Sequence, residues 1–283
     1  MNKKLLSVYG LKWNPFAPDL PDEALWRPPA LEHFCWRMEQ QVRDGGFALI
    51  TGGDPGTGKS VALRVAARQL ATLPDVLIGA LSRPQSKLAD IYRELGDLFS
   101  VPFSPSNRWG GFKALREKWQ AHLAATLYRP VLLIDEAQQM QPEVFSELRL
   151  LASTNFDSRS LLTVVLAGDS RLLERLRSPD LVPLGSRIRT RLVLDYLTPR
   201  DLAVFVEHLL TQSGNPRLMT PELITTLCER AAGNYRVLCN MAADLLTEGI
   251  RREAAQLDEK LYLEVFAPPT KQRNRSDGRR TTG

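Results

Sequence analysis

Short apolar runs alternate with amphipathic stretches through the first two thirds of the chain. The apolar runs, each of a length suited to one strand, are 47–50, 76–81, 131–134, 162–167 and 192–194. The stretches between them repeat their apolar residues at helical spacing, as in 61–70, 86–99, 112–127 and the segment from Pro142. Strands that alternate with helices predict a parallel sheet with right-handed crossovers, whose ligands bind at the carboxyl ends of the strands. We therefore expect an α/β fold, with a parallel five-stranded sheet flanked by helices.

The pattern changes at Thr198, after which only helices are expected. Thr198 and Thr220 are each followed by proline, which places an N-cap residue before a favoured first helical residue, and Gly233 suits a helix C-cap. At the other end of the chain, five prolines within the first 30 residues exclude a single helix. The predicted parts are an irregular segment that packs on the core (1–30), an α/β domain (31–197), a small helical lid (198–266) and a disordered basic tail (267–283).

A glycine-rich turn after the first strand carries the first candidate chemistry. Residues 53–60 fit the pattern G-x-x-x-x-G-K-[ST], and the pattern stands between a predicted strand and a predicted helix, as a phosphate-binding loop requires. The glycines let successive backbone N–H groups face a phosphate, and the start of the helix adds the positive end of its dipole. Lys59 is expected to reach the β- and γ-phosphates of a nucleotide, and Ser60 to bind Mg²⁺. The predicted nucleotide-binding residues are Gly53, Asp54, Pro55, Gly56, Thr57, Gly58, Lys59, Ser60 and Val61.

A pair of acids follows the third predicted strand. The wholly apolar run 131–134 is typical of a strand covered on both faces, and it ends on Asp135 and Glu136. A carboxylate at the end of a buried strand is costly unless a cation meets it, so Asp135 is interpreted as the partner of a nucleotide-bound Mg²⁺. Glu136, beside it, is in position to polarise an attacking water. The alternative is a strand end with two solvated acids, which the phosphate-binding loop makes less favourable.

Composition and charge limit the classes of function. The chain is 43% hydrophobic and 24% charged, as is ordinary for a soluble globular protein, and no apolar run approaches the roughly 18 residues of a membrane span. The net charge is +5, but residues 271–283 carry a local +4, so the rest of the chain is nearly neutral. The three cysteines show neither a C-x-x-C spacing nor clustered histidines, which indicates reduced thiols in a cytoplasmic protein.

Together these residues resemble a known family, the AAA+ ATPases. Within it, the chain is similar to the branch that contains the secretion-associated ATPase ExeA and the transposition helper ATPases TniB, TnsC and MuB. The stretches that carry the resemblance are 9–16 (YGLKWNPF), 135–138 (DEAQ) and 232–236 (AGNYR). The resemblance covers residues 5 to about 250 and implies an Mg²⁺-dependent enzyme that hydrolyses ATP.

The resemblance also implies roles for residues outside the two motifs. Asp169 or Ser170 takes the sensor 1 position, although an aspartate departs from the usual neutral polar residue there. Arg236 takes the sensor 2 position. Arg187 is similar to the arginine finger that acts on a neighbouring subunit's nucleotide, with Arg189 and Arg191 as open alternatives. The catalytic residues expected on this basis are Lys59, Glu136, Asp169 and Arg187.

The arginine finger implies a homo-oligomer, as a ring or a helical filament, and two classes of partner remain open. The first hypothesis is an ATP-dependent regulator of transposition that assembles on double-stranded DNA and recruits or activates a transposase, without a membrane partner. Plausible phosphate contacts are Arg83, Lys87, Arg108 and Lys113, with an ordinary solvated face as the alternative. Trp109 among them is a contact or a core residue, and we favour the core. The alternative is a secretion-assembly or protein-remodelling ATPase of the ExeA type, without a nucleic acid partner. A small-molecule kinase is disfavoured because Glu136 directly follows Asp135 and a helical lid follows the sheet.

Overall fold

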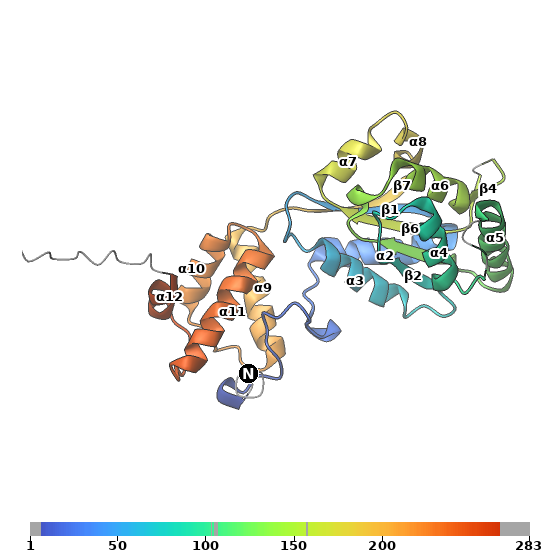
Figure 1. Cartoon of the computed structure of the whole chain (residues 1–283). Coiled ribbons are helices and arrows are strands. Elements are labelled where there is room, and N and C mark those ends of the chain that lie inside the picture. The colour runs from blue at the N-terminus through green and yellow to red at the C-terminus, as the bar shows by residue number, and fades with distance from the viewer. Residues whose placement is uncertain (1–6, 103, 105–106, 157, 267–283) are drawn as a thin grey trace, which may run out of the picture.

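The computed structural model describes residues 7–102, 104, 107–156 and 158–266. Its centre is a five-stranded parallel sheet in the order β2-β3-β6-β1-β7 (Figure 1). The strands are β1 (Gly46–Gly52), β2 (Ile78–Leu81), β3 (Val131–Ile134), β6 (Thr163–Gly168) and β7 (Ile188–Leu194). All five parallel strands end at the same edge of the sheet, as the alternation of strands and helices predicted. The predicted α/β architecture is therefore confirmed.

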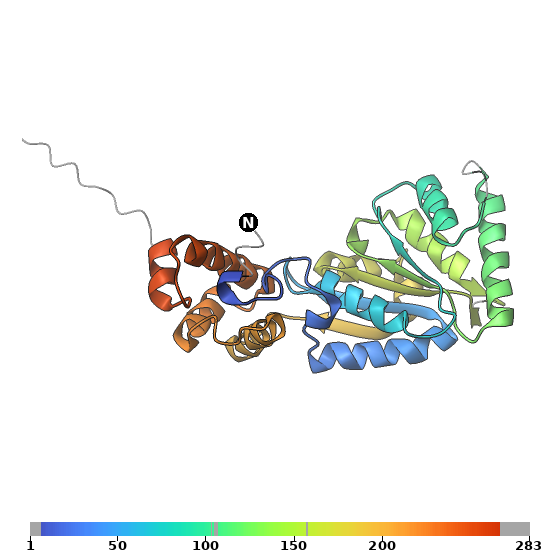
Figure 2. The ribbon, with the colours of Figure 1, turned by 90° about the horizontal axis from the view of Figure 1, so that it is seen from below.

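Helices cover both faces of the sheet, as Figure 2 shows from below. Alternate residues of the central strands point to opposite faces, so Ala48 and Ile50 pack on one helical layer while Phe47 and Leu49 pack on the other. The first layer consists of α2 (Pro29–Asp44) and α3 (Lys59–Leu70). The second consists of α4 (Leu88–Leu98), α5 (Arg108–Ala125), α6 (Pro142–Ala152), α7 (Ser170–Leu176) and α8 (Val182–Gly185).

The fifth strand is longer than the apolar run at 192–194 suggested. β7 begins at Ile188, so Arg189 and Arg191 lie within the strand instead of before it. Its residues alternate between buried and exposed because β7 is an edge strand with one face open to solvent. The apolar run that predicted the strand covers only its last three residues, because the exposed arginines interrupt the apolar pattern before it.

Short elements connect the larger ones. A 3₁₀ turn, η1 (Asp22–Ala24), precedes α2, and a second, η2 (Ala137–Gln139), follows β3. A two-stranded antiparallel hairpin joins β4 (Ser153–Thr154) to β5 (Arg159–Ser160) before β6. The turn η2 matters for the site, because it directs the chain back across the end of β6, with which it is in contact.

The lid consists of α9 (Pro199–Ser213), α10 (Pro221–Ala231), α11 (Tyr235–Arg251) and α12 (Glu259–Phe266), which lie together beside the sheet (Figure 1). The threonines predicted as N-caps do cap their helices, since Thr198 accepts from Asp201 N and Thr220 accepts from Leu223 N. The helices pack on one another through a separate apolar cluster. The predicted tail (267–283) lies outside the described residues.

The sequence predicts that the N-terminal segment packs on the α/β core, but the segment packs on the lid as well. Tyr9, Leu11 and Phe16 are buried among the helices of the lid. Gly249 of α11 leaves the space that Tyr9 fills, because a Cβ at that glycine would lie 2.6 Å from the tyrosine hydroxyl. Leu20 packs against both clusters, and Leu25 lies in the cluster beneath α2 and α3. The segment thus connects lid and sheet domain.

Candidate nucleotide-binding site

The loop between β1 and α3 has the backbone that its glycines predict. Gly56 and Gly58 have φ angles of +96° and +92°, a region that glycine adopts without steric cost. Gly58 is also the N-cap of α3, so the loop passes directly into the start of that helix. The N–H groups of the first helical turn have no partner within a helix, and together with the helix dipole they favour an anion.

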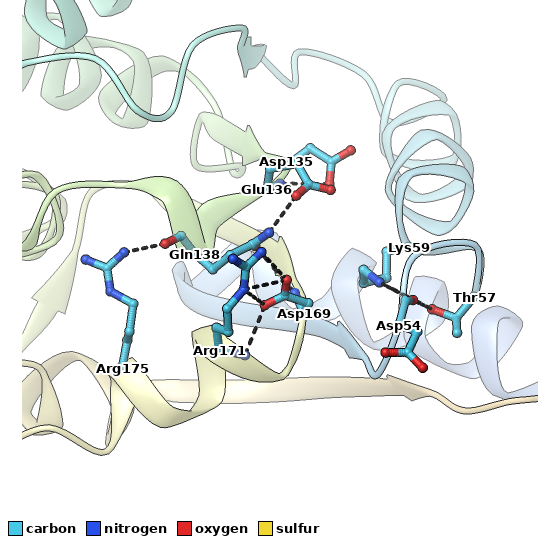
Figure 3. Close-up of polar contacts among 9 residues, drawn as sticks. All are labelled: Asp54, Thr57, Lys59, Asp135, Glu136, Gln138, Asp169, Arg171 and Arg175. Atoms are coloured by element: carbon cyan, nitrogen blue, oxygen red, sulfur yellow. Dashed lines mark hydrogen bonds and ion pairs between the residues drawn. The ribbon is translucent and has the colours of Figure 1, made fainter.

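Lys59 is buried in this loop with neutral partners. Only 7% of its surface is exposed, and its Nζ donates to the carbonyl oxygen of Asp54 (3.0 Å) and to Thr57 Oγ1 (3.4 Å) (Figure 3). It forms no ion pair with any other residue that the structure describes. Burying an ammonium group without a counter-ion is costly, so the loop is suited to a bound anion such as a phosphate.

Ser60 and Asp135 supply the hydroxyl and carboxylate oxygens that suit Mg²⁺. Ser60 is exposed in the first turn of α3, and Asp135 follows β3 at the same sheet edge, with β6 between β3 and β1. Asp135 is half-buried, and its Oδ1 accepts from Glu136 N at 2.9 Å. Oxygen ligands of these two kinds are those that Mg²⁺ takes beside nucleotide phosphates. The residues present therefore fit an Mg²⁺-bound nucleotide.

Glu136 is exposed and is held by its neighbours in an uncommon backbone conformation. Its φ of +51° lies in the left-handed region, which costs a non-glycine residue free energy and recurs at functional sites. Gln138 Nε2 donates to Glu136 Oε2 at 2.5 Å, and Gln138 Oε1 accepts from Asp169 N at 3.4 Å. Figure 3 shows this connection between the ends of β3 and β6.

Asp169 is engaged with a residue that the motifs did not indicate. Its carboxylate caps α7 by accepting from Arg171 N (3.0 Å), and it receives Arg171 Nη2 at 2.6 Å and Nε at 2.9 Å. These bonds to Arg171 hold the pKa of Asp169 below its ordinary value, and the charge of Lys59 adds to the effect. The guanidinium of Arg171 is exposed; its bonds to Asp169 raise its pKa, and the charge of Glu136 adds to the effect. Ser170 is exposed at the start of α7.

The three candidate arginines lie around α8 and β7. Arg187 donates to the carbonyl oxygen of Pro183, and Arg191 Nη2 donates to that of Gly185 at 3.5 Å. Arg189 Nη1 lies 3.9 Å from Asp44 Oδ2, at the end of α2. Arg189 and Arg191 are exposed, while Arg187 is half-buried. The choice among them as an arginine finger stays a prediction.

The lid contacts the phosphate-binding loop through residues that the motifs did not assign. Asn234 Nδ2 donates to the carbonyl oxygen of Pro55 at 2.9 Å, and the Tyr196 hydroxyl donates to Asp54 Oδ2. A Cβ at Gly56 would lie 2.8 Å from the Cβ of Arg236, so that arginine also starts beside the loop. The stretch 232–236 contains Asn234, but these contacts join segments 179 and 142 positions apart, so no local spacing indicates them.

Buried thiols complete the chemistry of the described residues. Burial raises the pKa of Cys35 and of Cys228 to about 11, and that of Cys239 to about 12. The three are free cysteines and remain protonated at neutral pH. No group of three or more histidine, cysteine, aspartate or glutamate residues within the described ranges is placed to hold a metal ion. Nor is any helix there long and apolar enough to cross a bilayer.

Comparisons with known sequences relate the chain to a protein family. Residues 41–176 match a family described as an AAA domain. General secretion pathway protein A of Aeromonas hydrophila is 34% identical over 219 residues, which is 76% of this chain and 38% of that protein. The chain thus spans well under half the length of this relative.

Solved structures show the same fold. Cdc6p from Pyrobaculum aerophilum superposes with a TM-score of 0.66 at 15% identity, covering 86% of this chain and 67% of that one. Domain III of the replication initiation protein DnaA from Thermotoga maritima gives a TM-score of 0.61 at 17% identity, covering 88% of this chain and 96% of that one. With the motifs, the family match and the fold in agreement, the chain belongs to the AAA+ ATPase family.

Proposed function

We propose that the chain is an ATP-driven oligomeric switch that assembles on duplex DNA and recruits or activates a transposase. The observation that carries the nucleotide part is the buried Lys59 ammonium, whose hydrogen-bond partners among the described residues are neutral. A triphosphate would supply the missing counter-charge. Because the same loop contacts the lid through Pro55, nucleotide binding is placed to alter the position of the lid.

Each residue of the site has a role in this proposal. Lys59 and the backbone N–H groups of the loop bind the phosphates, and Ser60 with Asp135 would hold Mg²⁺, which neutralises negative charge on the triphosphate. Glu136 orients the attacking water. Arg187 of one subunit stabilises the transition state at its neighbour, a type of contribution worth about 10³ to 10⁵ in rate.

Basic and aromatic side chains at the starts of α4 and α5 support DNA as the partner. Glu147, buried on α6, accepts from Tyr92 of α4 and from Arg108 of α5, and it thereby holds the first turns of both helices together. Lys87, at the N-cap of α4, and Lys113 are exposed there, as is Arg83.

Trp109 belongs to this surface and not to the core, so the expectation of a core position is wrong. Its side chain is 73% exposed in the first turn of α5, which Asn107 caps by accepting from Gly110 N. The indole stacks on Phe112 at 5.7 Å, and Arg116 lies over the other aromatic ring at 5.1 Å. Exposed aromatic rings among cations are a common feature of nucleic-acid-binding surfaces.

A fluorescence anisotropy titration tests the DNA partner. We expect labelled duplex DNA to bind more tightly with a slowly hydrolysed ATP analogue than without nucleotide, and affinity to fall as salt rises. Lys113→Glu should weaken binding and reduce the salt dependence by about one released counter-ion. Lys118→Glu, which changes another exposed lysine of α5, is the matched control. Binding that is absent, or indifferent to nucleotide and salt, would contradict the DNA proposal.

The likeness to general secretion pathway protein A favours a second candidate, a secretion-assembly ATPase without a nucleic acid partner. This candidate predicts ATP hydrolysis that duplex DNA does not change, together with co-sedimentation of the protein with envelope components. The same protein preparation can be used for both measurements. DNA-stimulated hydrolysis without co-sedimentation would exclude it.

A further inference from the structure

We infer that Gln138 is a positioning residue for hydrolysis, which holds the carboxylate of Glu136 and links it to the end of β6. This inference rests on the proposed role of Glu136 as the group that orients water. Gln138 belongs to the turn η2 and ends the stretch 135–138 that carries the family resemblance, but the sequence assigned it no role in binding or catalysis.

The side-chain amide of Gln138 forms a hydrogen bond at each end, between residues that follow two strands. Its Nε2 donates to Glu136 Oε2 at 2.5 Å, and its Oε1 accepts from Asp169 N at 3.4 Å. Only 7% of the residue is exposed, so water does not compete freely for either bond. Because Oε2 of Glu136 accepts from Gln138, this bond restricts the orientation of the carboxylate.

The surrounding residues hold this glutamine in place. Arg175 of α7 donates to the Gln138 carbonyl oxygen and stacks over Phe145 at 5.3 Å. Gly168, the last residue of β6, leaves the space that the amide occupies, because a Cβ there would lie 2.5 Å from Gln138 Oε1. The left-handed backbone of Glu136 is held in the same way, since Gln139 N donates to the Glu136 carbonyl oxygen at 2.9 Å.

Gln138 couples the end of β3 to the end of β6. Gln138 accepts from the backbone N–H of Asp169. The carboxylate of the same aspartate pairs with Arg171, on which the charge of Glu136 also acts. A shift of the β6 end on phosphate binding would move the Gln138 amide and with it the Glu136 carboxylate. The glutamine therefore transmits the state of the β6 end to the group that orients water.

Gln138→Met tests this inference, because methionine has a similar length but cannot make either hydrogen bond. We expect kcat to fall about tenfold to a hundredfold, since a hydrogen bond to a charged group is lost, while KM and fluorescent ATP binding stay within about twofold. Gln139→Met, at the exposed neighbouring glutamine, is the matched control and should hydrolyse ATP normally. A merely structural glutamine would instead lower the unfolding temperature and weaken binding together with kcat.

A double variant separates this inference from the role on which it depends. In a Glu136→Gln background, Gln138→Met should reduce the residual rate less than twofold, because the carboxylate it positions is already gone. If Glu136→Gln is inactive but Gln138→Met keeps a native kcat, the inference is overturned alone. If Glu136→Gln hydrolyses ATP normally, the role of Glu136 and this inference are both overturned. Gln138→Asn, which is too short to span both partners, gives the same test should the methionine variant fail to fold.

Discussion

Lys59 shows how a single residue can indicate the ligand of a site. A buried ammonium group whose described partners are all neutral requires an anion, and the start of α3 directs N–H groups to the same place. The sequence motif named the residue, while the structure supplies the physical reason for its role. Burial makes the lysine costly without its anion, so it contributes to binding more than a surface lysine would.

We predict that Lys59→Ala removes ATP binding. Truncating one partner of a desolvated charge pair costs about 2–5 kcal/mol, which is at least about thirtyfold in Kd. Isothermal titration calorimetry with ATP and Mg²⁺ measures the loss. Lys260→Ala, at an exposed lysine of α12, should bind ATP as the native protein does. Native affinity in Lys59→Ala would remove the lysine from the site.

We predict the opposite division of effects for Glu136→Gln. The amide cannot polarise water, but it keeps the size of the side chain, so ATP should bind within about threefold of the native affinity while kcat falls at least about a hundredfold. Single-turnover hydrolysis with excess enzyme separates the chemical step from binding. Undiminished turnover in this variant would contradict the proposed role of Glu136.

Some residues of the site could be predicted from the sequence and others could not. Lys59 and Asp135 are named by local patterns, because a strand, a glycine turn and a helix must follow one another closely to bind a phosphate. Gln138 and Asn234 act through contacts between distant segments, and no local spacing records those contacts. Arg171 was missed because an arginine in a helical pattern resembles an ordinary surface charge until Asp169 is seen to hold it.

At the scale of elements, the helix α11 begins on the phosphate-binding loop. Asn234 caps the helix by accepting from Arg236 N (3.0 Å) and Val237 N (3.2 Å), and its Nδ2 donates to the Pro55 carbonyl oxygen. One side chain thus forms the helix end and ties it to the loop. Movement of the loop on nucleotide binding must therefore act on the helix that carries Arg236.

Two substitutions at Asn234 separate the capping of α11 from the hydrogen bond to Pro55. Serine is about as good an N-cap as asparagine but is too short to reach Pro55, whereas alanine loses both contacts. We predict that Asn234→Ser leaves the free energy of unfolding unchanged, while Asn234→Ala lowers it by about 1 kcal/mol. Both should release fluorescent ADP about two- to tenfold faster, because one hydrogen bond between lid and loop is lost. Stopped-flow release and urea unfolding measure the two effects, and native release rates in both variants would contradict the coupling.

Elements with strong apolar patterns were predicted well, and weakly patterned ones were not. The central strand β3 has the predicted bounds, because it is buried on both faces and every residue of it is apolar. The edge strand β7 was predicted too short, because its exposed arginines hide half of it. The hairpin β4–β5 was not predicted, since two-residue strands have no periodicity to detect.

At the scale of the whole molecule, the chain has the sheet domain and the lid that an AAA+ ATPase requires, and the site lies where the lid meets the sheet edge (Figure 1). Arg187 and Arg191 contact residues of the segment around α8, while Lys59 and Asn234 contact the phosphate-binding loop. In the proposed role, Arg187 acts on the nucleotide of a neighbouring subunit.

Mixing two inactive variants tests whether Arg187 acts on a neighbouring subunit. We predict that Arg187→Ala binds ATP normally but hydrolyses it at least about a thousandfold more slowly, and that Lys59→Ala is inactive because it binds no ATP. In a mixture, a Lys59→Ala subunit still presents its Arg187 to the nucleotide of an Arg187→Ala neighbour, so hydrolysis should return. Restoration should increase with protein concentration, since it depends on assembly. Arg189→Ala and Arg191→Ala, tested in the same mixtures, show which of the three arginines is responsible. A mixture that assembles but stays inactive would contradict action between subunits.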